Sequence, residues 1–291
     1  MNKIASQDEF EEALTAVPFT VKPRGRSLGA EIIGLDLKDG LDDATVRAFE
    51  ATLIKYKVVY LREQFITPAE QIAITKKLGT LESNPFRPTG DVEQIMVLDN
   101  HKDNPVLSTD VWHADMTFKQ QPTKYAILRC DIMPETGGDT LWADMAAAYR
   151  GLSEPFRKMI DGLKARHDFQ NFRVLFKKTD EDQKRLREME ARFPNPSHPV
   201  VRTHPVTGEK CIYVNRQFVL FIEDLAPDES KALLELLYAQ VQYPEYQFRL
   251  RWEPGTIAFW DNTCTQHYAS NDYYPERRRM ERTSTEGEVP A

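Results

Sequence analysis

The feature that most constrains this chain is a His-x-Asp motif at His113 and Asp115, which is followed far downstream by His267. Side chains two residues apart on an extended strand lie on the same face of that strand. We therefore predict a strand over residues 112–118 that directs His113 and Asp115 toward one metal ion, with His267 as the third ligand. The fold must then bring two distant segments of the chain to a single point.

One core has to unite these candidate ligands, because they lie on both sides of the middle of the sequence. A chain of 291 residues is long enough to bury such a core. No Gly/Ser-rich or Pro-rich linker divides the sequence, and no repeat recurs at the periods of solenoids or propellers. We predict a single domain over residues 1–291, with a short polar N-terminal extension at about residues 1–15.

Composition argues against several classes of function. A net charge of -7 and a pI near 5.5 disfavour a nucleic-acid partner, since phosphate binding relies on clustered Lys and Arg. No stretch approaches the roughly 20 apolar residues of a membrane span, and the first residues lack the apolar run of a signal peptide. The three widely spaced cysteines form no CxxC pair. We expect a cytoplasmic protein with reduced thiols and no membrane association.

The sequence predicts many short strands, with helices at the start and in the middle. Strand patterns fall at residues 20–23, 30–33, 57–61, 125–131, 139–142, 199–202, 211–214, 247–252 and 256–260. Helical patterns fall at residues 43–53, from 68 onward, and at 146–152, 154–163, 179–192 and 228–240. This order favours a mainly β protein with flanking helices, whose core is a double-stranded β-helix (jelly roll) with a helical insertion.

The chemistry of the three candidate ligands points to redox-active iron. Two imidazoles and one carboxylate on one side of an octahedral ion leave three positions open, as in non-haem Fe(II) oxygenases. A cosubstrate and oxygen would bind there. Arg278 and Arg282 follow soon after His267. An oxygenase with a dicarboxylate cosubstrate needs a fixed cation for its far end, and a guanidinium binds a carboxylate through two parallel hydrogen bonds.

Four segments together resemble the TauD/TfdA family of 2-oxoglutarate-dependent dioxygenases. They are Trp112 to Phe118, Gly137 to Trp142, His198 to Pro205 and Trp260 to Tyr268. The segments occur in the order and at the spacing of that family, and the similarity runs from about Gly29 to Arg282. The resemblance implies an enzyme that uses 2-oxoglutarate and O2 to hydroxylate a small anionic organic substrate, with succinate and CO2 as co-products. It also implies a homodimer or homotetramer.

The resemblance assigns roles to individual residues. His113, Asp115 and His267 would bind Fe(II). Thr140 and Arg278 would hold the distal carboxylate of 2-oxoglutarate, and Arg282 would bind the anionic group of the substrate. Further substrate residues are expected at Asn84, Arg87, Thr109, Phe169 and Phe218. The first three differ from the residues of taurine-specific members, so the substrate remains open among sulfonates, sulfate esters, phosphonates and carboxylates.

Two other classes of protein fit part of the pattern. Two His and one carboxylate can hold catalytic zinc in a hydrolase, although hydrolysis gives no reason for Thr140 and Arg278. A jelly roll could also bind an anionic ligand without catalysis. Arg282 has a structural alternative as well, which is an internal ion pair with Glu281 or Asp272.

Overall fold

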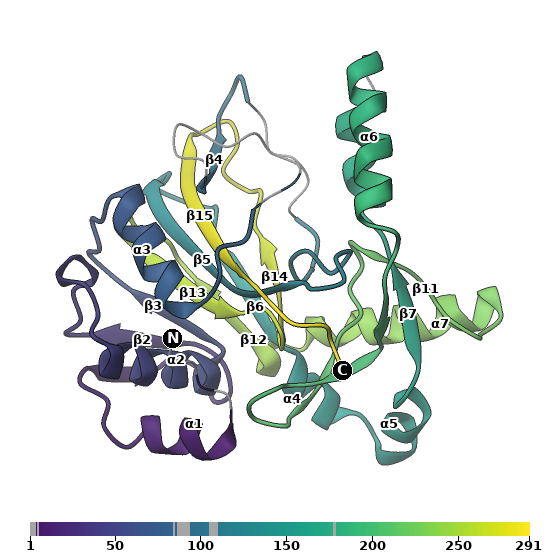
Figure 1. Ribbon diagram of the computed structural model, residues 1–291, viewed down its shortest axis with the longest axis horizontal. Coiled ribbons are helices and arrows are strands. Elements are labelled where there is room, and N and C mark those ends of the chain that lie inside the picture. The colour runs from purple at the N-terminus through teal and green to yellow at the C-terminus, as the bar shows by residue number, and fades with distance from the viewer. Residues whose placement is uncertain (1–3, 5, 84, 86–93, 105–109, 177–178) are drawn as a thin grey trace.

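The computed structural model is mainly β, with helices arranged around packed sheets (Figure 1). It describes residues 4, 6–83, 85, 94–104, 110–176 and 179–291. In their order across it, the strands of the seven-stranded main sheet are β1 (Thr20–Pro23), β2 (Ala30–Ile33), β3 (Val58–Leu61), β13 (Ile257–Asp261), β5 (Thr123–Ile132), β15 (Arg278–Glu286) and β4 (Met96–Asn100). Neighbours are antiparallel except β2 and β3, which run parallel.

A three-stranded inner sheet packs against one face of the main sheet. It consists of β12 (Gln247–Leu250), β6 (Thr140–Asp144) and β14 (Thr265–Ala269), with β6 in the middle. One apolar cluster joins the two sheets and includes Tyr60 from β3, Trp142 from β6 and Trp260 from β13. Two sheets that share a core in this way form a double-stranded β-helix, so the predicted fold class is confirmed.

Helices cover the opposite face of the main sheet. There α2 (Asp43–Tyr56) and α3 (Pro68–Leu78) share a second apolar cluster with Phe259 of β13. Both helices begin where the sequence predicts, because Asp42 caps α2 and Thr67 forms a capping box at the start of α3. The central strands β3 and β13 of the main sheet are therefore buried on both faces.

The helical insertion follows β6. It contains α4 (Met145–Gly151), α5 (Glu154–Ile160), the 3-10 helix η2 (Gln170–Phe176) and α6 (Asp180–Arg192), and α6 stands away from the rest of the molecule in Figure 1. A third sheet is formed by β11 (Val219–Ile222), β7 (Lys164–His167) and β8 (Ser197–Pro199). The remaining elements are the pair β9 (Val201–Thr203) and β10 (Lys210–Ile212), α7 (Pro227–Tyr238), and the 3-10 helices η1 (Leu37–Asp39), η3 (Ala239–Gln242) and η4 (Pro244–Tyr246). Among the described residues, none of the helices has the length and apolar character needed to cross a membrane.

One prediction of local structure is wrong. The strand expected over residues 112–118 is a single bridge at His113 followed by a turn, in which Met116 has a φ of 55°. Much of the expected N-terminal extension is a helix, α1 (Gln7–Ala13), which packs on α2 and buries Phe10 in the core. Its few apolar residues are spaced for one helical face, so its polar composition hid a packed element.

Candidate active site

His113 and His267 lie directly opposite each other on two antiparallel segments. The backbone N–H of His113 donates to the His267 carbonyl at 3.0 Å, and the N–H of His267 donates to the His113 carbonyl at 2.8 Å. Their ring centroids are 4.2 Å apart. His267 belongs to β14, where it pairs with Trp142 of β6. The inner sheet thus fixes one imidazole and, through the bridge, the other.

Asp115 reaches these imidazoles from a turn rather than from a strand. The turn folds Asp115 back, so that Oδ1 lies 3.8 Å from His113 Nε2 and Oδ2 lies 3.8 Å from His267 Nε2. The three ligand atoms lie within 4.8 Å of one another, and all three side chains are buried.

The surroundings keep both imidazoles neutral and the carboxyl ionised. Burial lowers the pKa of His113, and it lowers the pKa of His267 to about 3. Burial alone would raise the pKa of Asp115, but the adjacent Arg282 guanidinium outweighs this effect, and the pKa is lowered to about 2. Nδ1 of His113 lies 2.7 Å from the Val111 carbonyl, so a proton on Nδ1 leaves Nε2 free to face Asp115. These are the protonation states that bind a divalent metal.

Arg282 contacts Asp115 directly. Its Nη1 lies 3.1 Å from Oδ1 of Asp115, and its Nη2 lies 2.6 Å from Oδ2. Neither of the two alternative ion pairs of Arg282 is formed. Glu281 pairs with Arg129 instead, and Asp272 accepts a backbone N–H. Arg282 therefore places a positive charge at the edge of the ligand set.

Arg278 is a buried cation that has no carboxylate partner among the described residues. Arg278 is the first residue of β15, and it is only 4% exposed. Nε donates to the Gly138 carbonyl at 3.0 Å, whereas Nη2 has no hydrogen-bond partner within the described part of the chain. Burial lowers the pKa of this guanidinium. Because an unpaired buried charge is costly, this position is suited to an anion from outside the chain.

Thr140 opens β6 on the same face of the inner sheet as His267. It pairs with Ala269 of β14, two residues beyond the pair formed by Trp142 and His267. Directly opposed residues of antiparallel strands share a face, as do alternate residues of one strand. The Thr140 Oγ1 accepts a hydrogen bond from the Trp252 indole at 2.9 Å. The hydroxyl keeps its own hydrogen to donate to an anion.

Phe218 and Phe169 belong to an aromatic cluster beside His113. The Phe218 ring centroid lies 6.4 Å from that of His113. Phe169 lies further from His113: its ring centroid is 5.8 Å from that of Phe118, which is itself 5.3 Å from that of Phe218. Both predicted residues are buried. Asn84, Arg87 and Thr109 lie outside the described residues.

Three residues that shape the site were missed by sequence reasoning. Asn262 hydrogen-bonds both backbone groups of Asp115, and Trp252 fixes Thr140. Gly138 has a φ of +72°, and a Cβ there would lie 3.0 Å from Cδ of Arg278, so glycine permits their close approach. The available signals were the Gly-Gly and Trp-Asp-Asn sequences beside the predicted ligands.

Comparisons with known sequences agree with this geometry. The model of the family described as "Taurine catabolism dioxygenase TauD, TfdA family" matches residues 20–284. An α-ketoglutarate-dependent sulfate ester dioxygenase from Pseudomonas putida is 37% identical and covers 94% of this chain and 92% of its own length. An alkylsulfatase from Acinetobacter baylyi is 34% identical, over 90% of this chain and 83% of its own.

Solved structures share the fold over most of the chain. A taurine dioxygenase from Burkholderia xenovorans has a TM-score of 0.80 at 34% identity, over 94% of this chain and 91% of that chain. AAD-2, solved in complex with Mn(II) and N-oxalylglycine, has a TM-score of 0.80 at 26% identity, over 94% of this chain and 99% of that one. The chain therefore belongs to the TauD/TfdA family and is a 2-oxoglutarate-dependent dioxygenase, an oxidoreductase.

Proposed function

We propose that this enzyme holds Fe(II) with His113, Asp115 and His267 and hydroxylates a small anionic organic substrate. The observation that carries the proposal is the buried ligand set, whose three atoms lie within 4.8 Å of one another. Two neutral imidazoles and one carboxylate fit Fe(II) and leave the other positions of an octahedral ion open. Bound iron, with 2-oxoglutarate and O2, supplies an oxidant for a C–H bond while 2-oxoglutarate becomes succinate and CO2.

Arg278 and Thr140 are the proposed holders of the distal carboxylate of 2-oxoglutarate. Arg278 has an unused Nη2 donor, and Thr140 has a hydroxyl hydrogen that the Trp252 indole leaves free. Both donors are buried, which strengthens their bonds to a carboxylate. AAD-2, which has the same fold, was solved with N-oxalylglycine, a dicarboxylate like 2-oxoglutarate.

Within the anionic class, we infer a sulfate ester with an apolar body. Two relatives with at least 34% identity are a sulfate ester dioxygenase and an alkylsulfatase. In this chain Arg282 supplies a cation at the edge of the ligand set, and Phe218 supplies an apolar wall beside His113. Hydroxylation of the carbon that bears the sulfate gives a product that collapses to an aldehyde and inorganic sulfate.

The test is coupled turnover with defined substrates. Enzyme supplied with Fe(II) and 2-oxoglutarate should consume O2 and release succinate and sulfate in equal amounts when given a medium-chain alkyl sulfate. Taurine, alkyl phosphonates and aryloxy acids should give slower coupled turnover. Faster coupled turnover with one of these acids would contradict the sulfate ester assignment while leaving the iron assignment intact.

The metal requires its own arm of that experiment. Replacement of Fe(II) by Zn(II) should abolish O2 uptake, and His113→Ala should do the same with Fe(II). Substrate cleavage by the zinc-loaded enzyme without 2-oxoglutarate would instead support a hydrolase.

The expected homodimer or homotetramer can be checked by light scattering during gel filtration.

A further inference from the structure

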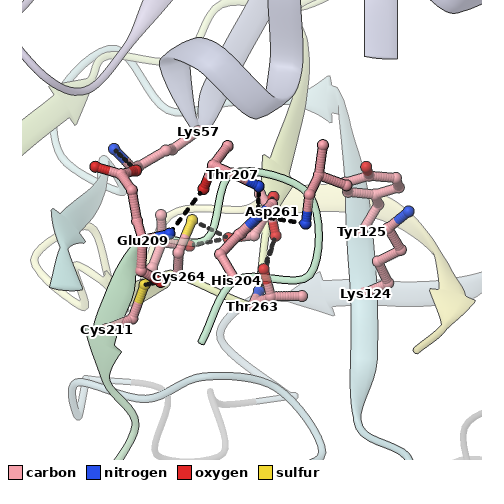
Figure 2. Close-up of polar contacts among 12 residues, drawn as sticks. Lys57, Lys124, Tyr125, His204, Thr207, Glu209, Cys211, Asp261, Thr263 and Cys264 are labelled. Carbon is pink, nitrogen blue, oxygen red and sulfur yellow. Dashed lines mark hydrogen bonds and ion pairs between the residues drawn. The ribbon is translucent and has the colours of Figure 1, made fainter. Parts of the chain in front are cut away.

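A second buried group of reactive side chains lies at the turn between β13 and β14. His204 Nε2 lies 2.9 Å from Oδ2 of Asp261, and Figure 2 shows these side chains facing each other. Together with Cys264 they offer three potential ligand atoms within 4.8 Å of one another. All three residues are buried. The question is whether this group binds a second metal or serves the first site.

The hydrogen bonds of His204 argue against a second metal. Its Nδ1 accepts the backbone N–H groups of Val206 at 3.2 Å and Thr207 at 3.1 Å, so Nδ1 carries no proton. The neutral ring then carries its proton on Nε2, which donates to Asp261. Neither nitrogen keeps a lone pair for a metal. Burial also raises the pKa of the Cys264 thiol, which keeps that sulfur protonated.

The other oxygen atoms of Asp261 accept hydrogen bonds from residues of the turn between β13 and β14. Oδ1 accepts the backbone N–H of Thr263 at 2.9 Å and the Thr263 hydroxyl at 2.5 Å. The Asp261 carbonyl accepts the Thr265 hydroxyl at 2.7 Å. His204 fixes the carboxylate from the opposite side. The pair therefore sets the conformation of the turn that leads into β14.

Asn262 lies in this turn and reaches across to the metal ligand Asp115. Its Oδ1 accepts the Asp115 N–H at 2.7 Å, and its Nδ2 donates to the Asp115 carbonyl at 3.1 Å and to the Thr123 carbonyl at 3.0 Å. Asn262 is 0% exposed, and its own N–H donates to the Lys124 carbonyl at 2.8 Å. Backbone pairing with β14 ends at His113. Beyond it, the Asn262 side-chain amide makes the hydrogen bonds to the Asp115 backbone that a neighbouring strand would otherwise make.

We propose that Asn262 is a positioning residue for the Asp115 carboxylate and that the His204–Asp261 pair locks Asn262 in place. The proposal rests on the proposed function, since it needs Asp115 to bind the metal. Met116, the next residue, has a φ of 55°, so no regular strand holds Asp115. Loss of such an outer contact typically lowers metal affinity by roughly 10–100-fold.

The test measures metal affinity separately from stability. Metal-free protein is titrated with Co(II) without oxygen, and the visible absorption of bound Co(II) reports both affinity and coordination geometry. Thermal unfolding of each metal-free variant is recorded in parallel. Asn262→Ala should weaken Co(II) binding by roughly 10–100-fold and alter the spectrum. His204→Ala should show a smaller loss of the same kind, and His204→Gln, which can still donate to Asp261, should restore part of it.

Ser230→Ala is the matched control. The Ser230 hydroxyl accepts the buried Ile222 N–H at 2.8 Å and joins α7 to β11, away from the turn. Its loss should lower the unfolding temperature without changing Co(II) affinity or spectrum. If Asn262→Ala does not fold, His204→Ala carries the test.

The outcomes separate this inference from the proposed function. Wild-type affinity and spectrum in Asn262→Ala, or in His204→Ala if that variant carries the test, would overturn the positioning role. Wild-type protein that binds no Co(II) would overturn the metal centre and this inference with it. Binding of two Co(II) ions per chain, with an intense thiolate absorption lost in Cys264→Ala, would show that the second group is a metal site and not a lock.

Discussion

Two arginines on β15 differ in what satisfies their charge. Arg282 lies 2.6 Å from the Asp115 carboxylate, whereas the hydrogen bond of the Arg278 Nε goes to the neutral Gly138 carbonyl. A guanidinium that is already paired gives up part of that interaction when it binds a ligand. A buried guanidinium that, like that of Arg278, has no carboxylate partner among the described residues gives up less. Arg278 should therefore contribute more to the affinity for 2-oxoglutarate than Arg282 contributes to the affinity for the substrate anion.

We expect Arg278→Lys to raise the KM for 2-oxoglutarate by roughly 10–100-fold, because an ammonium cannot form two parallel hydrogen bonds with a carboxylate. Succinate release at varied 2-oxoglutarate measures this change. Arg277→Lys is the matched control, since Arg277 is an exposed neighbour paired with Asp99. Equal KM values for 2-oxoglutarate in Arg278→Lys and wild type would contradict the assignment.

Asp261 should give the fold a defined pH dependence. Burial opposes its charge, but His204 and Thr263 lower its pKa from the ordinary 3.8 to about 2. A carboxyl with a lowered folded pKa stabilises the fold above its unfolded pKa, and that contribution disappears as the pH falls through the folded pKa. The contribution should therefore be present at pH 5 and largely lost near pH 2.

Urea unfolding of wild type and Asp261→Asn measures this contribution. The advantage of wild type in free energy of unfolding should shrink by about 1.5 kcal/mol between pH 5 and pH 2.5. An advantage that stays constant over this range would mean that folding does not lower the pKa of the Asp261 carboxyl.

The grouping of His113, Asp115 and His267 could be predicted from sequence because the ability to coordinate a metal is a property of His and Asp side chains themselves. The partner of Arg282 and the role of Asn262 could not. Asn262 contacts a residue 147 positions away, and that contact exists only once the β13–β14 turn has closed. Arg282 was expected to bind the substrate, with an ion pair to Glu281 or Asp272 as the alternative, and its contact with Asp115 was not foreseen.

At the scale of elements, β15 shows why some strands escape sequence reasoning. Its nine residues carry charges that usually mark an exposed segment. In the structure these charges have partners, since Glu281 pairs with Arg129 and Arg279 pairs with Asp131. The strand expected over residues 112–118 fails for the opposite reason, because its apolar residues pack around a turn.

The turn that precedes β6 should be intolerant of a side chain at Gly138. A Cβ there would lie 2.6 Å from Met133 Cε, 3.0 Å from Arg278 Cδ and 3.1 Å from Arg278 Nε. We expect Gly138→Ala to raise the KM for 2-oxoglutarate more than 10-fold, an order-of-magnitude estimate, because the methyl group displaces Arg278.

Gly162→Ala separates this displacement from backbone strain. Gly162 also has a positive φ, at +86°, but nothing lies within 4 Å of a Cβ placed there. Both variants should lose some stability, as residues forced into positive φ do. Only Gly138→Ala should change the KM for 2-oxoglutarate in steady-state assays, and an equal change in both would refute the contact with Arg278.

At the scale of the whole molecule, the site is formed by residues of two sheets that pack against each other. His267 and Thr140 come from the inner sheet, while Arg278 and Arg282 come from the main sheet. The general architecture was predictable because ligands on both sides of the sequence require one core. The paths of the connecting segments were not, since short apolar runs carry no information about which strands pair.

A site assembled in this way should couple ligand binding to global stability. Ligands that bind only the folded state stabilise it by RT ln(1 + [L]/Kd), or about 2.7 kcal/mol at 100 times Kd. Mn(II) together with 2-oxoglutarate should therefore raise the unfolding temperature by roughly 5 °C, because each kcal/mol of stabilisation corresponds to about 2 °C in a domain near this size. A chelator should reverse the rise. His113→Ala should show no rise, whereas His101→Ala, outside the ligand set, should behave like wild type. A full rise in His113→Ala would place the metal elsewhere in the molecule.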